Sequence, residues 1–125
     1  MYKLYLALAA VFGALSVILG AFAAHGLKSR LDDYAKGIWE TAVQYQTTHA
    51  LALMILAILM KNYVTSSSLK VAGISWVIGI VIFSGSLYCL ALTRMKWLGA
   101  ITPIGGVAFI VGWLALLIFA IKGYE

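Results

Sequence analysis

The sequence predicts an all-α integral membrane protein, a four-helix bundle of four transmembrane helices with a short amphipathic segment between the first two. Of its 125 residues, 64% are hydrophobic and 10% are charged, whereas a soluble domain carries about 25% charged residues. The length allows about four crossings of roughly 20 residues each. We expect helices because each crossing must satisfy its own backbone hydrogen bonds, and no alternating barrel pattern is visible.

The apolar stretches form one transmembrane domain over residues 1–125, with spans at roughly 4–24, 39–60, 69–92 and 98–121. The first span begins after Lys3 and ends near a stretch that imitates a signal-peptide cleavage site. Its apolar run exceeds the about 7–15 residues of a signal peptide, so we expect a retained span. Small residues recur on one of its faces and favour close helix packing; they are Gly13, Ser16, Gly20 and Ala24.

The segment 27–38 is polar but carries apolar residues at helical spacing, among them Leu27 and Leu31. A short amphipathic helix on the headgroup surface fits this pattern, with Asp32 or Asp33 as its N-cap. An ordinary polar loop fits it equally well.

The second span is polar in its first half and apolar in its second. The polar half contains Gln44, Tyr45, Gln46, Thr48 and His49. At 1.5 Å per residue, His49 lies roughly 15 Å from Trp39, which is near mid-membrane if Trp39 marks the interface. We therefore expect part of this polar face to lie inside the bundle, opposite Ser84 and Tyr88 of the third span and His25 at the end of the first.

In the third span, Ser84 and Tyr88 share a face, and Ser86 points elsewhere. Cys89 is expected to be a small buried residue. The fourth span either begins at Thr102 as N-cap with Pro103 in the first turn, or runs from Trp97 and is kinked by Pro103. A second stripe of small residues follows in this span, at Gly105, Ala108, Gly112 and Ala115.

The net charge of +5 comes from Lys and Arg residues at the span ends, where such side chains reach toward headgroups. Membrane lipids are therefore the expected partners, rather than nucleic acid. The two stripes of small residues fit either close packing within one bundle or the seam of a homo-oligomer. Because a bundle of four helices has little room for a central conduit, we expect a homo-oligomer. The cations divide almost equally between the two ends, so the positive-inside rule leaves the orientation open.

Four strings of this sequence, in the right order, resemble the DUF423 (transmembrane protein 256-like) family of small multi-pass membrane proteins. They are GAFAAHGL (residues 20–27), TAVQYQTTHALAL (41–53), FSGSLYCLAL (83–92) and ITPIGG (101–106). The resemblance implies a multi-pass protein of a bacterial cell (inner) membrane, and it brings no reaction, substrate or catalytic residue with it. Two departures stand out: Ala23 where the family has Gly, and Arg94 where a small residue is usual.

The expected function is non-enzymatic: binding or passage of a small solute, ion or lipid along a polar face. We expect that face to be lined by His25, Gln44, Tyr45, Gln46, Thr48, His49, Ser84, Ser86, Tyr88 and Thr102. The main alternative is a membrane scaffold whose buried polar belt only specifies helix packing.

An enzyme is a further alternative, with Ser84 or Ser86 as nucleophile and His49 as base, but no GxSxG or HExxH motif supports it. Binding of haem or metal by His25 and His49 would need both rings at a similar depth. We expect no cofactor, no metal and no catalytic residue.

Overall fold

The structure is a computed structural model that describes residues 1–122. Its elements are α1 (Tyr2–His25), α2 (Asp33–Asn62), α3 (Ser67–Gly79), η1 (Ile80–Ser84), α4 (Gly85–Thr93) and α5 (Leu98–Lys122). Because α3, η1 and α4 form one continuous stretch, the described chain has four helices that are long and apolar enough to cross a membrane. Each of them contains one of the predicted spans, and the predicted all-α fold class is confirmed.

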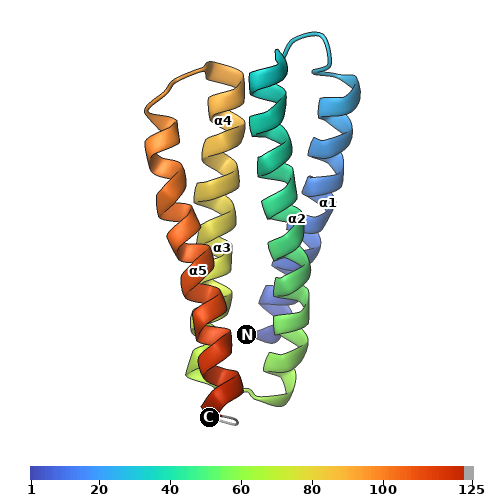
Figure 1. Cartoon of the computed structure of the whole chain (residues 1–125). Helices are drawn as coiled ribbons and strands as arrows, with labels where there is room; N and C mark the ends of the chain where they lie inside the picture. The colour runs from blue at the N-terminus through green and yellow to red at the C-terminus, as the bar shows by residue number, and fades with distance from the viewer. Residues whose placement is uncertain (123–125) are drawn as a thin grey trace.

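The helices run alternately up and down, so Met1 and the end of α5 lie at one end of the bundle (Figure 1). The α1–α2 and α4–α5 connections lie at the opposite end. The closest packing joins α1 to α2 and α3 to α5, and α2 also packs on α3, η1 and α4. The main core lies around Leu53, Leu56 and Trp76, between α2, α3 and α5, and includes Tyr5 and Ala9 of α1.

The α1–α2 connection settles the choice that the sequence left open. Residues 26–32 form turns rather than a separate helix, and α2 begins at Asp33. Leu27 and Leu31 are buried with Trp39, so the apolar side of this segment packs against the bundle instead of lying on headgroups.

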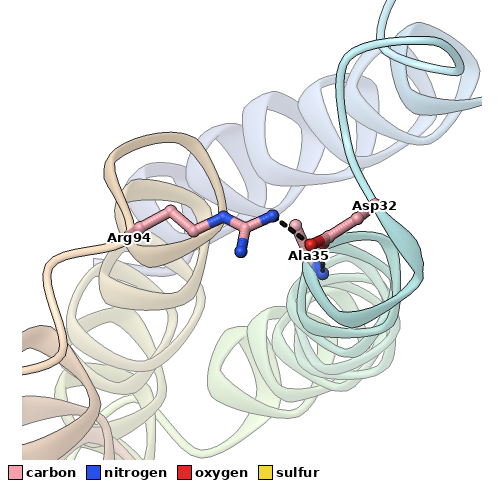
Figure 2. A network of polar contacts seen from close by, with 3 residues as sticks. All are labelled: Asp32, Ala35 and Arg94. Atoms are coloured by element: carbon pink, nitrogen blue, oxygen red, sulfur yellow. Dashed lines mark hydrogen bonds and ion pairs between the residues drawn. The ribbon is translucent and has the colours of Figure 1, made fainter.

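Asp32 joins two connections at this end. One carboxylate oxygen accepts a hydrogen bond of 2.9 Å from the Ala35 N–H as the N-cap of α2, and the other forms an ion pair with Arg94 (Figure 2). Arg94 follows α4 in a left-handed conformation with φ 62°, which L-residues adopt only at a cost. The ion pair thus ties the start of α2 to the end of α4.

The structure decides between the two alternatives for the fourth span, and it overturns one expectation for the third. Pro103 lies inside α5, which begins at Leu98, in agreement with a helix that starts near Trp97. Thr102 donates to the Leu98 carbonyl at 3.2 Å instead of capping a helix. Cys89 is exposed rather than buried, because α4 buries the opposite side, with Ser86, Leu87 and Leu90.

The two stripes of small residues have different surroundings. On α5, a Cβ at Gly105 would collide with the backbone of Phe83, and one at Gly112 with the ring of Trp76; Ala115 is buried and Ala108 half-buried. On α1, Ser16 is buried and a Cβ at Gly20 would reach Val43 at an ordinary 3.5 Å, but Ala24 is exposed and Gly13 faces open space. The α5 stripe therefore packs within the bundle, whereas the α1 stripe is partly open.

Candidate functional site

Gln46 is the centre of a polar network between three helices. Its Nε2 donates to the Phe12 carbonyl of α1 at 2.8 Å, and its Oε1 accepts from the Tyr88 hydroxyl of α4 at 2.7 Å. The Tyr88 ring lies 4.7 Å from the ring of Trp39, centroid to centroid. Gln46 is buried on α2, so its amide joins α1, α2 and α4 away from solvent.

His49 joins α2 to α5. Its Nε2 accepts a 3.0 Å hydrogen bond from the Trp113 indole N–H, and its Nδ1 lies 2.8 Å from the Tyr45 carbonyl. Because Nε2 accepts, Nδ1 must carry the proton that is donated to the carbonyl, and this arrangement is that of the neutral imidazole. The ring also stacks on Phe109 with centroids 3.7 Å apart.

The two serines of the third span form hydrogen bonds with different helices, in agreement with their predicted positions on different faces. The Ser84 hydroxyl donates to the Ala42 carbonyl of α2 at 2.8 Å, whereas the Ser86 and Thr102 hydroxyls lie 2.5 Å apart between α4 and α5. Neither serine contacts His49, whose ring nitrogens both have other partners, so the Ser–His pair of the enzyme alternative is not formed. Over residues 1–122, every buried side-chain nitrogen or oxygen atom has a hydrogen-bond partner.

The side chains of the remaining predicted residues make no hydrogen bond within this network. His25 is exposed in the last turn of α1, and Gln44 and Thr48 are exposed on α2. Tyr45 is 41% exposed, with its ring 4.5 Å from that of Phe83. The helical period explains the division, because Ala42, Gln46 and His49 form the buried face of α2 and Gln44 and Thr48 fall beside it.

The histidines do not form a paired ligand site. His25 is exposed at the end of α1, whereas His49 is buried between α2 and α5. In the described part of the chain, no group of three or more His, Cys, Asp or Glu side chains is placed to hold a metal ion.

A pocket of about 390 Å³ lies between the end of α1 and the start of α2. Its apolar wall combines small residues of α1 with Trp39 and Val43, and its polar rim carries Lys28, Lys36, Glu40 and Gln44. The Trp39 indole is held in place by a 2.9 Å hydrogen bond to the Leu19 carbonyl. Of these residues, Gln44 is a predicted site residue, and Gly20 and Ala24 are predicted packing residues. The spacing of four between Lys36, Glu40 and Gln44 is the sequence signal that could have revealed the rim.

The charges of the rim are not paired within the part of the chain that the structure describes. Among residues 1–122, Lys28, Lys36 and Glu40 take part in no ion pair, and the one ion pair found there joins Asp32 and Arg94. The Arg94 guanidinium and the Ala35 N–H lower the pKa of the Asp32 carboxyl. The carboxylate of Asp32 is therefore already engaged by these two partners. The lining of the pocket therefore includes two lysines and one glutamate that have no ion-pair partner among residues 1–122, together with an apolar wall.

Comparisons with known proteins point to one family. The family described as "Protein of unknown function (DUF423)" matches residues 19–106. A UPF0382 membrane protein of Staphylococcus haemolyticus is 48% identical over 96% of this chain and 97% of its own length. The UPF0382 membrane protein YwdK of Bacillus subtilis is 45% identical over 96% of this chain and 98% of its own length. No solved structure matches the chain.

Proposed function

This chain belongs to the DUF423 family of multi-pass membrane proteins, and we propose that it binds the anionic group of a ligand in the pocket between α1 and α2. The observation that carries the proposal is the pair of ammonium groups, Lys28 and Lys36, that line the pocket without a partner in the described chain. A concave, mostly apolar pocket with a few convergent polar groups is the usual form of a ligand site.

The position of the pocket supports an anion at the membrane surface. It lies at the end of the bundle that carries the α1–α2 connection, where Trp39 is buried beside the rim. Tryptophan is enriched at the membrane–water interface, and each Lys near an anionic surface contributes about 1 kcal/mol of attraction. Glu40 opposes an anion, so the net charge of the rim is about +1 by count of its side chains.

Binding fits the geometry better than passage. The buried groups of α2 on which a path would depend, Gln46 and His49, already have partners on other helices. This favours a structural role for the inner network, as in the scaffold alternative, together with a ligand site at its edge where Gln44 is exposed.

Titration with inorganic phosphate tests the proposal. The protein in a neutral detergent should show saturable NMR shifts of the amides around Lys36 and Gln44, with chloride at equal ionic strength as reference. The variant Lys36→Gln should weaken binding about fivefold, the equivalent of about 1 kcal/mol, and Glu40→Gln should strengthen it.

Lys61→Gln is the matched control, because Lys61 is exposed at the opposite end of α2 and does not line the pocket. Phosphate shifts that Lys28→Gln and Lys36→Gln leave unchanged, or that Lys61→Gln removes equally, would overturn the proposed function.

A further inference from the structure

We infer that the ligand is a membrane phospholipid, with its phosphate in the α1–α2 pocket and one acyl chain in a groove that continues along the same two helices. This inference rests on the proposed function, because the pocket must hold the phosphate. It adds the chemical class of the ligand and a second, apolar part of the site.

The groove is a hollow of about 360 Å³ between α1 and α2. Its walls include Ala10, Gly13 and Val17 of α1 and Thr47, Leu51 and Met54 of α2. The two hydroxyls beside it are occupied within the protein: Ser16 donates to the Gly13 carbonyl at 2.7 Å and Thr47 to the Val43 carbonyl at 2.8 Å. A groove with mostly apolar walls, whose two hydroxyl protons are already donated to backbone carbonyls, suits hydrocarbon better than a polar solute.

The pocket and the groove lie on one side of one helix pair. Along α1 the groove residues Ala10, Gly13 and Val17 lead at spacings of three and four to Gly20 and Ala24 of the pocket. Along α2 the residues 54, 51 and 47 lead in the same way to 43, 40 and 36. Residues at these spacings share a helix face, so one ligand can contact both hollows.

The length of this surface suits an acyl chain that starts at the interface. From Ala24 to Ala10 the rise along α1 is about 21 Å at 1.5 Å per residue. Half of the hydrocarbon core is about 15 Å thick, so a chain that starts beside Lys28 reaches the membrane centre within the groove.

The positive charge at one end of this surface favours a phospholipid as the occupant over a helix from a second copy of the chain. The end of the surface next to the α1–α2 connection carries Lys28 and Lys36, and their positive charges complement a phosphate. Inside a bilayer the acyl chain is already surrounded by hydrocarbon, so the groove can add only packing contacts to its binding. The choice of headgroup therefore depends on the two lysines.

Native mass spectrometry from a neutral detergent, with dioleoyl phosphatidylglycerol as the probe, tests the inference. The variant Gly13→Leu fills the groove, since a Cβ at Gly13 meets open space and the fold need not shift. Gly85→Leu is the matched control: its Cβ also meets open space, but Gly85 lies on α4, outside the groove.

We expect Gly13→Leu to weaken lipid binding about fivefold through lost packing contacts and to leave the phosphate titration unchanged. Gly85→Leu should change neither lipid binding nor the phosphate titration, and Lys36→Gln should weaken both lipid binding and phosphate binding.

Equal lipid binding by Gly13→Leu and Gly85→Leu would overturn the assignment of the groove to an acyl chain, while phosphate binding in the pocket would still stand. A dimer mass that disappears in Gly13→Leu, with lipid binding unchanged, would assign the groove to a second copy and also overturn the inference. Failure of the proposed function is a separate result, in which the phosphate titration does not depend on Lys28 or Lys36.

Discussion

Gln46 and His49 show how buried polar side chains are used in this protein. Each is buried and each bonds to groups on other helices, Gln46 to α1 and α4 and His49 to α5. A polar side chain in hydrocarbon is costly unless it is paired. Helices that slide or rotate would lose these partners, so the two residues fix the register of α2 against its neighbours.

The Tyr88–Gln46 hydrogen bond should contribute modestly to stability. We predict a coupling of about 0.6 kcal/mol between Tyr88→Phe and Gln46→Leu in a double-mutant cycle, the average for such bonds in membrane proteins. Unfolding in mixed micelles with increasing denaturing detergent measures it. Strictly additive effects of the two substitutions would show that the bond does not form.

Asp32 should make the stability depend on pH. Because the Arg94 guanidinium and the Ala35 N–H lower its pKa in the folded state, its stabilising contribution is complete above the unfolded pKa of about 4. It is lost as the pH falls through the lower folded pKa. Between pH 6 and pH 3, the unfolding temperature of the wild type should therefore fall more than that of Asp32→Asn. The Asn side chain can still act as the N-cap but carries no charge.

Asp33→Asn is the control for this pH effect, since Asp33 forms no ion pair with the described residues. It should keep the pH response of the wild type. An Asp32→Asn variant with the same response as the wild type would refute the role of the ion pair.

At the scale of elements, the stripes of small residues on α5 and α1 are similar in sequence but have different roles in the structure. Gly105 and Gly112 bring α5 into contact with the backbone of Phe83 and the ring of Trp76. The stripe on α1 borders the groove at Gly13 and the pocket at Gly20 and Ala24. Tight packing holds α3 to α5, while α1 keeps an accessible surface.

Glycine-to-alanine substitutions should separate these two cases. Gly105→Ala places a methyl group against backbone that cannot move aside, and overpacking of this kind costs about 1–3 kcal/mol. Gly13→Ala meets open space and should be neutral or slightly stabilising, because alanine favours the helix by up to about 1 kcal/mol. Unfolding of both variants in mixed micelles measures the difference, and equal destabilisation would contradict it.

The positions of the helices along the chain can be predicted from the sequence more easily than which face of each helix is buried. Apolar runs of membrane length define the four spans. The spacing of Ser84, Ser86 and Tyr88 predicts correctly that Ser84 and Tyr88 share a face and that Ser86 points elsewhere. Which face of α2 is buried depends on tertiary packing, and this is why Gln44 and Thr48 lie outside the network that includes Gln46. The pocket depends on the turns at 26–32, which bring Lys28 near Lys36, and no helical periodicity reports such a turn.

At the scale of the whole molecule, the bundle has two distinct ends. One end carries Lys28, Arg30, Lys36, Arg94 and Lys96 with the pocket and the Asp32–Arg94 ion pair. The other carries Lys3, Lys61, Lys70 and Lys122 with the two ends of the described chain. The homo-oligomer predicted from the sequence stays a prediction, which cross-linking in lipid can test.

Labelling of single cysteines in sealed vesicles should report this two-ended arrangement. After Cys89→Ser removes the exposed native thiol, Lys3→Cys and Lys122→Cys should react with an impermeant maleimide from the same side. Lys96→Cys should react from the opposite side. Labelling of positions 3 and 122 from opposite sides would contradict the even number of crossings.

The π-helical turn Ile80–Ser84 has a consequence for how this chain tolerates changes in length. A π turn closes its hydrogen bonds over five residues instead of four, so this stretch accommodates one amino acid more than an unbroken α-helix. Deleting one amino acid here would let the stretch close as a regular α-helix, because about five residues of a π turn rotate the chain as far as about four residues of an α-helix. Tyr88 would then still face α2, and Ser86 would still face α5. A deletion of one residue within Ile80–Ser84 should therefore be tolerated better than a deletion within the regular turns of α4.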